Sequence, residues 1–226
     1  MRTLFACAFL LSVCLTALPA APIDPAAYTA PIRVACVGDS ITAGSGAEKG
    51  KAYPSQLQAL LGDEWVVKNF GVSGRTLLAK GDHPYIKEKA YTDAQAFLPD
   101  VVVIMLGTND TKPQNWVHQD EFVSDYKALI ESFKGLSSHP RVFICRPCPV
   151  PGKGNFGINE ANLQIEIPVI DKIAAEEGAD LIDMHAALQS HPELLPDRVH
   201  PNTAGAGIMA QTVATALTGK PAPATP

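Results

Sequence analysis

Residues 32–40 read Ile-Arg-Val-Ala-Cys-Val-Gly-Asp-Ser, a mostly apolar run that ends abruptly on a glycine and two small polar residues. A short apolar run without alternation predicts a strand that is buried on both faces, as in a parallel sheet. The glycine permits a sharp turn, and Ser40 then opens the next segment with its hydroxyl at the sheet edge. A serine at that place is a candidate nucleophile, although Asp and Ser are also ordinary turn and helix-capping residues.

A candidate partner for Ser40 lies near the other end of the chain, in Asp197-Arg198-Val199-His200. A histidine can act as the base for a serine, and it needs a carboxylate on its other ring nitrogen to fix its tautomer. Asp197 is close enough in sequence to His200 to do this within one loop. Because only a fold that returns the C-terminus to the first strand joins the two pieces, the pair predicts a fold and a chemistry together. His185, two residues after Asp183, is the rival base.

The rest of the chain alternates strand and helix patterns. Short apolar runs predict five buried parallel strands, at Ile32–Val37, Trp65–Phe70, Val101–Leu106, Val142–Cys145 and Asp180–Met184. Helical spacing predicts helices at Tyr53–Leu61, Ile86–Phe97, Glu121–Phe133, Asn159–Glu177 and Thr203–Leu217, with a break or kink at Pro168. The alternation implies right-handed crossovers and an α/β fold, a three-layer α/β/α sandwich around one parallel sheet. Ligands bind at the carboxyl edge of such sheets, where the proline- and glycine-rich loop Pro147–Gly157 follows a strand.

The N-terminus has the features of a secretory signal peptide at residues 1–21, with Arg2, an apolar run from Leu4 to Leu18, and small residues up to Ala21. The run is short and early for a membrane span. A buried N-terminal helix and a lipid anchor at Cys14 are the alternatives. We therefore expect a secreted or periplasmic protein with one catalytic domain at residues 30–218. Residues 219–226, rich in proline and alanine, are expected to form a disordered tail.

Charge and cysteine content narrow the classes of partner and chemistry. Without Arg2, 17 basic side chains face 23 acidic ones, a balance of −6, and no basic cluster stands out, so we expect no nucleic-acid partner. No second apolar run reaches membrane-spanning length, so we expect no stable membrane association. Cys36 is interpreted as a small buried residue, whereas Cys145 and Cys148 can form a local disulfide in an exported protein. The prolines around this pair oppose the helix N-terminus that redox chemistry needs.

Two more loops at the predicted sheet edge carry unusual residues. The loop 69–76 contains Gly71 and Gly74, which let the backbone approach a ligand and point an amide at it, although a plain turn explains them equally well. Gly107-Thr108-Asn109-Asp110 ends a very apolar strand on four small polar residues. The Asn109 amide can donate to an oxyanion, an interaction that contributes about 2.7–4 kcal/mol in acyl-transfer transition states. The structural alternative for Asn109 is an Asx turn.

Taken together, these segments resemble the four sequence blocks of the SGNH hydrolase, or GDSL esterase, superfamily, namely Gly38-Asp39-Ser40, Gly74, Gly107-Thr108-Asn109-Asp110 and Asp197-Arg198-Val199-His200. The resemblance implies that Ser40 is the nucleophile, His200 the general base and Asp197 its orienting acid. It implies an oxyanion hole made of the backbone amides of Ser40 and Gly74 and the side chain of Asn109. It also implies a five-stranded parallel sheet in the flavodoxin-like order 2-1-3-4-5, and two-step acyl transfer without a metal or organic cofactor.

A closer resemblance is to secreted bacterial carbohydrate acetylesterases, including sialate O-acetylesterases, and it rests on Gly107-Thr108-Asn109-Asp110-Thr111-Lys112-Pro113-Gln114-Asn115-Trp116 and Pro151-Gly152-Lys153-Gly154-Asn155-Phe156-Gly157-Ile158-Asn159. It implies acetyl esters of a small molecule or a polysaccharide as substrates. Trp116 can stack on a sugar face or be a packed lid residue. Arg146, Lys153 and Asn155 can hydrogen-bond hydroxyls or a carboxylate, or be solvated loop residues. The candidate substrate contacts are Asp39, Trp116, Arg146 and Asn155.

Two other interpretations stay open. The same fold can carry a lysophospholipase, arylesterase or thioesterase, although no long apolar insertion is visible to act as a lipase lid. A noncatalytic sugar-binding module is the other interpretation, and the intact set of candidate catalytic residues argues against it. The sequence leaves open the natural sugar, the acyl-chain preference, the oligomeric state and the state of the Cys145–Cys148 pair.

Overall fold

One parallel sheet forms the centre of the molecule in the computed structural model, which describes residues 21–222. Its strands are β1 (Ile32–Gly38), β2 (Trp65–Gly71), β3 (Val101–Met105), β4 (Arg141–Arg146) and β5 (Asp180–Asp183). All neighbouring strands pair in parallel, in the order β2-β1-β3-β4-β5. The predicted fold class and strand order are therefore confirmed, and each predicted strand end lies within one residue of its observed place.

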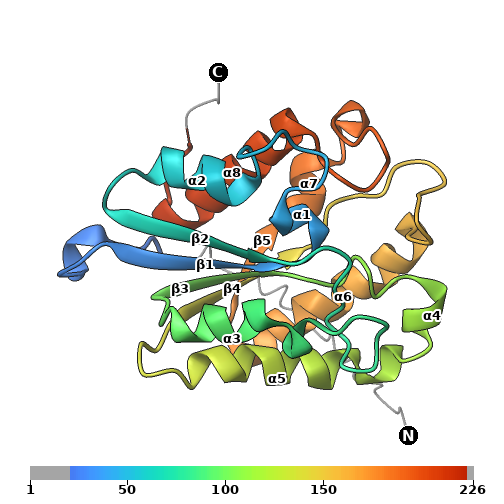
Figure 1. Ribbon diagram of the computed structural model, residues 1–226, viewed down its shortest axis with the longest axis horizontal. Coiled ribbons are helices and arrows are strands. Elements are labelled where there is room, and N and C mark those ends of the chain that lie inside the picture. The colour runs from blue at the N-terminus through green and yellow to red at the C-terminus, as the bar shows by residue number, and fades with distance from the viewer. Residues whose placement is uncertain (1–20, 223–226) are drawn as a thin grey trace, which may run out of the picture.

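Helices cover both faces of this sheet (Figure 1). One face carries α2 (Tyr53–Leu61), α7 (Met184–Leu188) and α8 (Thr203–Thr218), and the other carries α3 (Lys89–Ala96), α5 (Phe122–Lys134) and α6 (Glu160–Glu177). The single-turn helices α1 (Ser40–Ala43) and α4 (Pro113–Trp116) follow β1 and β3. The 3₁₀ turns in the connections are η1 (Pro25–Ala27), η2 (Tyr85–Lys87), η3 (Gln119–Glu121) and η4 (Pro192–Leu194). The result is the three-layer sandwich that the sequence predicts.

Strands β1 and β3 are almost entirely apolar because each faces helices on both sides. In β1, Val34 and Cys36 belong to the core under α2 and α8. The intervening Ala35 and Val37 belong to the core under α3, α5 and α6. The residues of β3 alternate between the two cores in the same way. This double burial fixes the sheet, and with it the positions of the loops at the carboxyl ends of the strands.

Two helical segments differ from the prediction. The segment expected as one helix at Ile86–Phe97 is divided into η2 and the shorter α3. Of the break or kink expected at Pro168, the break is wrong, because α6 runs through it as one helix. Pro168 is exposed, and so is Gln164, whose carbonyl loses its donor at position 168. Water can replace that donor, so the helix tolerates the proline.

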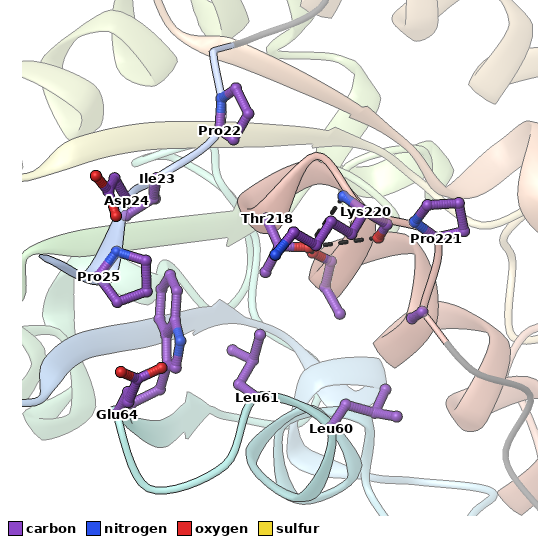
Figure 2. Close-up of a pocket in the computed structure, with 13 residues that line it drawn as sticks. Pro22, Ile23, Asp24, Pro25, Leu60, Leu61, Glu64, Thr218, Lys220 and Pro221 are labelled. Carbon is purple, nitrogen blue, oxygen red and sulfur yellow. Dashed lines mark hydrogen bonds between the residues drawn. The ribbon is translucent and has the colours of Figure 1, made fainter.

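The two ends of the described chain meet at the amino ends of the strands. The Ile23 N–H donates to the Leu217 carbonyl at 2.8 Å. Beside this contact a cavity of about 510 Å³ lies between the start of β2 and the segment after α8, with Lys220 on its wall (Figure 2). Of the expected signal peptide and tail, residues 1–20 and 223–226 lie outside the described residues. Within residues 21–222 no helix combines the length and the apolar character needed to cross a bilayer.

Cys36, Cys145 and Cys148 are buried free thiols, so the possible disulfide between Cys145 and Cys148 is not formed. Cys148 Sγ lies 3.9 Å from Met209 Sδ of α8. Burial raises the pKa of the Cys36 thiol to about 12 and the pKa values of the other two thiols further. The three side chains therefore stay protonated and pack as small apolar residues.

Candidate active site

Ser40 stands at the carboxyl end of β1 as the first residue of α1, and it is 8% exposed. Asp39 caps this short helix, because its Oδ1 accepts a hydrogen bond from the Ile41 N–H at 2.9 Å. Glycine is required just before it, since a Cβ added at Gly38 would lie 2.6 Å from the carbonyl oxygen of Met105. The turn can therefore pack directly against β3 and present the Ser40 hydroxyl at the sheet edge.

The loop before α8 brings His200 to Ser40. Ser40 Oγ lies 2.9 Å from His200 Nε2, and His200 Nδ1 lies 2.7 Å from Asp197 Oδ2. Asp197 Oδ1 accepts two further hydrogen bonds, from the backbone N–H groups of His200 at 2.7 Å and Val199 at 2.9 Å. A continuous chain of hydrogen bonds thus joins the hydroxyl, the imidazole and the carboxylate.

These contacts decide the ionisation of Asp197. Burial alone would raise the pKa of Asp197, but the hydrogen bonds from His200 and Val199 outweigh it and hold the pKa below its ordinary value. The carboxylate therefore stays ionised at neutral pH. An ionised Asp197 favours the tautomer with the proton on Nδ1, which leaves Nε2 free to accept a proton from Ser40.

His185, the rival base, is committed elsewhere. Its Nε2 lies 2.7 Å from Glu160 Oε1 and 3.2 Å from Gln164 Nε2, both on α6. These residues border a separate cavity of about 370 Å³. His200, and not His185, is the histidine that contacts Ser40.

The loop after β3 brings Asn109 next to the Ser40 turn. Asn109 Nδ2 donates to Asp39 Oδ2 and to the Arg75 carbonyl, each at 3.1 Å. The second bond ties this loop to the segment after β2, where Gly74 has a φ of +79° that favours glycine. Three strand ends therefore contribute to one site. Because both amide hydrogens of Asn109 have acceptors, donation to an oxyanion requires one of them to turn toward the substrate.

Three buried carboxyl groups lie behind this loop. Asp110 accepts hydrogen bonds from the backbone N–H groups of Leu77 at 3.0 Å and Leu78 at 2.8 Å. Both carboxyl oxygens of Glu166 lack a hydrogen-bond partner among the described residues. Burial raises the pKa of Asp39 to about 6, that of Asp110 to about 7, and that of Glu166 well above its ordinary value. These three buried groups therefore keep their protons to higher pH than exposed carboxyl groups do.

Glu166 is a site neighbour that the sequence reasoning missed. It lies on the core-facing stripe of α6 between Leu163 and Ile170. A Cβ added at Gly107 would lie 1.9 Å from Glu166 Oε1, so the carboxyl group packs on the first residue of the loop that carries Asn109. A glutamate in an apolar stripe at helical spacing is the signal that could have identified it.

Two of the candidate substrate contacts lie beside these groups. Asp39 is buried and holds Asn109 in place. Asn155 is exposed, and its Nδ2 donates to the carbonyl oxygen of Asp197 at 3.1 Å. Its neighbour Phe156, which the sequence reasoning passed over, has its ring centre 5.7 Å from that of His200. The signal that could have identified Phe156 is the glycines that flank this short segment at the sheet edge.

The other two candidates are engaged in structural contacts. Trp116, at the end of α4, is half-buried, and its ring packs edge-on against Phe122 at 6.2 Å between centres. The guanidinium of Arg146 binds both oxygens of Asp171, at 2.7 and 2.9 Å, and also Asp183. The structure therefore does not bring Arg146 into hydrogen-bond contact with Ser40, Asn109 or His200, because two carboxylates of α6 and β5 hold it. Among residues 21–222, no three His, Cys, Asp or Glu side chains group together in a way that could hold a metal ion.

The comparisons with known proteins find similarity to esterases and acylhydrolases. More narrowly, residues 36–208 match the model of the GDSL-like lipase/acylhydrolase family, and the chain belongs to that family. This confirms the resemblance seen in the four sequence blocks.

Three relatives illustrate the likeness. An acetylxylan esterase from Xylanibacter ruminicola is 42% identical over 85% of this chain and 44% of its own length, so the chain spans less than half of that relative. The crystal structure of an acetyl xylan esterase, AlAXEase, is 25% identical with a TM-score of 0.65, over 82% of this chain and 100% of that one. A putative arylesterase from Agrobacterium tumefaciens is 25% identical with a TM-score of 0.66, over 81% of this chain and 97% of that one.

Proposed function

We propose that this protein removes acetyl groups from esterified carbohydrates, with Ser40 as nucleophile, His200 as general base and Asp197 as its orienting acid. The observation that carries the proposal is the unbroken chain of contacts at 2.9 and 2.7 Å from Ser40 through His200 to Asp197. The likeness to acetylxylan esterases supports acetylated xylan as the first substrate to test.

The first half of the reaction forms an acetyl-enzyme. Ser40 Oγ attacks the ester carbonyl carbon while His200 Nε2 takes the hydroxyl proton, and the carbonyl electron pair moves to oxygen. The N–H groups of Ser40 and Gly74 and the amide of Asn109 stabilise that oxyanion. His200 then gives its proton to the leaving alcohol oxygen as the carbon–oxygen bond breaks.

The second half releases acetate. Water attacks the acetyl-Ser40 carbonyl, and His200 accepts the proton of that water. The tetrahedral intermediate collapses, His200 returns the proton to Ser40 Oγ, and acetic acid leaves and releases its remaining proton to water. Asp197 stabilises the imidazolium at both stages without taking the proton itself.

Ser40→Ala tests the assignment. The substitution should lower kcat for acetate release from acetylated xylan by roughly 10⁶-fold, since the nucleophile and its base act as a unit. Ser45→Ala, at a half-buried serine in the same turn, is the matched control and should keep full activity. Retained activity in Ser40→Ala would overturn the mechanism. A parallel panel of acetylated xyloglucan, pectin and sialic acid identifies the preferred sugar.

An arylesterase is the second candidate function, favoured by the likeness to the putative arylesterase structure. It predicts that phenyl acetate is cleaved with a higher kcat/KM than acetylated sugars. Rates on acetyl, octanoyl and palmitoyl esters of one alcohol test the acyl-chain preference. They separate both kinds of acetylesterase from a lysophospholipase or thioesterase that prefers long chains.

We also propose that residues 1–21 direct export to the periplasm or the medium. The support is the sequence pattern of Arg2, an apolar run and small residues before the expected cleavage point. Mass spectrometry of the protein recovered from a secreting host should find an N-terminus near residue 21. Recovery of the exported protein with Met1 intact would contradict the proposal.

A further inference from the structure

We propose that Phe156 is a platform on which the sugar ring of the leaving alcohol packs, an inference that rests on the proposed carbohydrate acetylesterase function. Phe156 lies in the loop between β4 and α6. Its ring centre is 5.7 Å from that of the His200 imidazole, with an angle of 51° between the ring planes. The residue is 56% exposed. An aromatic ring therefore stands in solvent directly beside the proposed catalytic base.

The backbone holds Phe156 in this place in spite of an unfavourable conformation. Its φ is +54°, in the left-handed region that bulky residues avoid. Asn155 stabilises the turn, because its Oδ1 accepts from the Phe156 N–H at 2.9 Å and its Nδ2 donates to the Asp197 carbonyl at 3.1 Å. Arg198 Nη1 adds a bond to the Gly154 carbonyl at 3.1 Å. The aromatic loop is thus fastened to the loop that carries Asp197 and His200.

The reaction geometry assigns this ring to the alcohol and not to the acyl group. His200 Nε2, which faces Ser40 Oγ, must also deliver the proton to the leaving oxygen, so the alcohol departs alongside the imidazole. The carbonyl oxygen of the ester would point instead toward the proposed oxyanion donors around Asn109. A ring beside the imidazole therefore meets the sugar that carries the ester, and its flat apolar face matches the C–H face of a pyranose while the sugar hydroxyls stay in water.

Packing distinguishes Phe156 from the aromatic residue that the sequence favoured for this role. Trp116 is occupied by its edge-on contact with Phe122 and by the core under α5. Phe156 lies outside the small apolar cluster beneath its own loop, which consists of Val150, Ile158, Leu163 and Val199. Phe156 is therefore strained, exposed and outside the core. A ligand that covers its ring explains why it is there.

The experiment compares two acetate esters that differ only in the alcohol. Wild type, Phe156→Ala, Phe156→Leu and Phe156→Trp are assayed on methyl tri-O-acetyl-β-xylopyranoside and on ethyl acetate. Phe156→Ala and Phe156→Leu should lower the ratio of the two kcat/KM values, sugar ester over ethyl ester, by about tenfold or more, the size of one lost pocket contact. Phe156→Trp should preserve the ratio. Val117→Ala, at a residue that is 72% exposed, is the control and should also preserve it.

The outcomes separate this inference from the function on which it rests. Equal losses on both esters in Phe156→Ala would mean that the ring only packs on His200, and would overturn the platform. An unchanged ratio in Phe156→Ala and Phe156→Leu would overturn it as well. In both cases the esterase assignment survives, because wild type still cleaves ethyl acetate. Only equal activity of wild type and Ser40→Ala removes the proposed function, and the platform with it.

Discussion

On one side of Ser40 the side chains of His200 and Asp197 are partly open to solvent, with exposed fractions of 17% and 36%. On the other side Asp39, Asn109 and Asp110 are at most 3% exposed. The base side holds its carboxylate ionised through hydrogen bonds, so the pKa of Asp197 lies below its ordinary value. The other side, which we call the oxyanion side after the proposed role of Asn109, buries carboxyl groups, so the pKa values of Asp39 and Asp110 rise to about 6 and about 7.

The difference fits the roles proposed for the two sides. A base that passes protons between Ser40, an alcohol and water has to be reached by those molecules. Donors to an oxyanion act most strongly where water is excluded and where they need not reorganise. The cost of the second arrangement is that neighbouring carboxyl groups lose hydration. The two sides should therefore respond differently to substitution and to pH.

Asp197→Asn breaks the base side alone. The amide oxygen can still accept the backbone hydrogen bonds of His200 and Val199, so the loop should keep its shape. It no longer fixes the Nδ1–H tautomer or stabilises the imidazolium, and kcat should fall about 10⁴-fold. Acetate release and thermal unfolding are measured together. Glu160→Gln, at the carboxylate that contacts the rival base His185, should leave kcat near the wild-type value; the reverse order of effects would exchange the two histidines.

Asn109→Ala breaks the oxyanion side alone. In the proposed mechanism it removes one donor to the oxyanion, along with the hydrogen bonds to Asp39 and Arg75, so kcat should fall about 10²–10³-fold while KM changes little. The loss should be smaller than that of Asp197→Asn, because the backbone donors of Ser40 and Gly74 remain. Steady-state kinetics on acetylated xylan give both constants. A loss confined to KM would mean that Asn109 binds the ground state instead.

Glu166→Gln sharpens the comparison through pH. Burial, with added repulsion from Asp110 and Asp39, raises the pKa of Glu166 far above its ordinary value of 4.5. The folded protein then keeps a proton that the unfolded chain releases above that pH. The free energy of unfolding of wild type should therefore fall, relative to Glu166→Gln, by up to about 1.4 kcal/mol for each pH unit above 4.5.

The neighbours of Glu166 define the control for this measurement. Tyr126, Asp110 and Asp39 are the titratable groups that face it, and they are unchanged in the variant. Glu176→Gln removes an exposed carboxylate of the same helix that pairs with Lys127 and whose pKa is lowered. It should show no stabilisation that grows with pH. The free energy of unfolding of the three proteins is measured with urea between pH 4.5 and 8. If it changes with pH in the same way for wild type and Glu166→Gln, Glu166 is ionised in the folded protein.

The sequence was informative about the fold because its signals are local. The apolar run of β3 and the spacing in α5 identify their elements without knowledge of any neighbour. The meeting of Ser40 with Asn109 could also be predicted, because parallel strands end at one edge. The single turns α1 and α4 are too short for periodicity, and Pro168 could be judged only with its exposure known.

The partners of Arg146, Phe156 and Glu166 were beyond the sequence. Nothing near Arg146 indicates that carboxylates of α6 and β5 would hold it. The left-handed backbone of Phe156 depends on the bond between Asn155 and the loop of Asp197. The burial of Glu166 depends on its contact with Gly107. Each of these facts joins segments that are far apart in the chain, where local patterns carry no information.

Arg146→Met has the smallest expected effect and tests a residue outside both sides of Ser40. Methionine keeps the apolar stem but removes the ion pairs with Asp171 and Asp183, whose side chains are 37% and 33% exposed. Pairs this open contribute about 0–1 kcal/mol, so the free energy of unfolding should fall by no more than about 1 kcal/mol, and less at high salt. Because the guanidinium is already bound, kcat/KM on neutral acetylated xylooligosaccharides should not change. The kinetics are measured on substrates with and without a sugar carboxylate. A KM that rises only for the acidic substrate would show that Arg146 binds substrate after all.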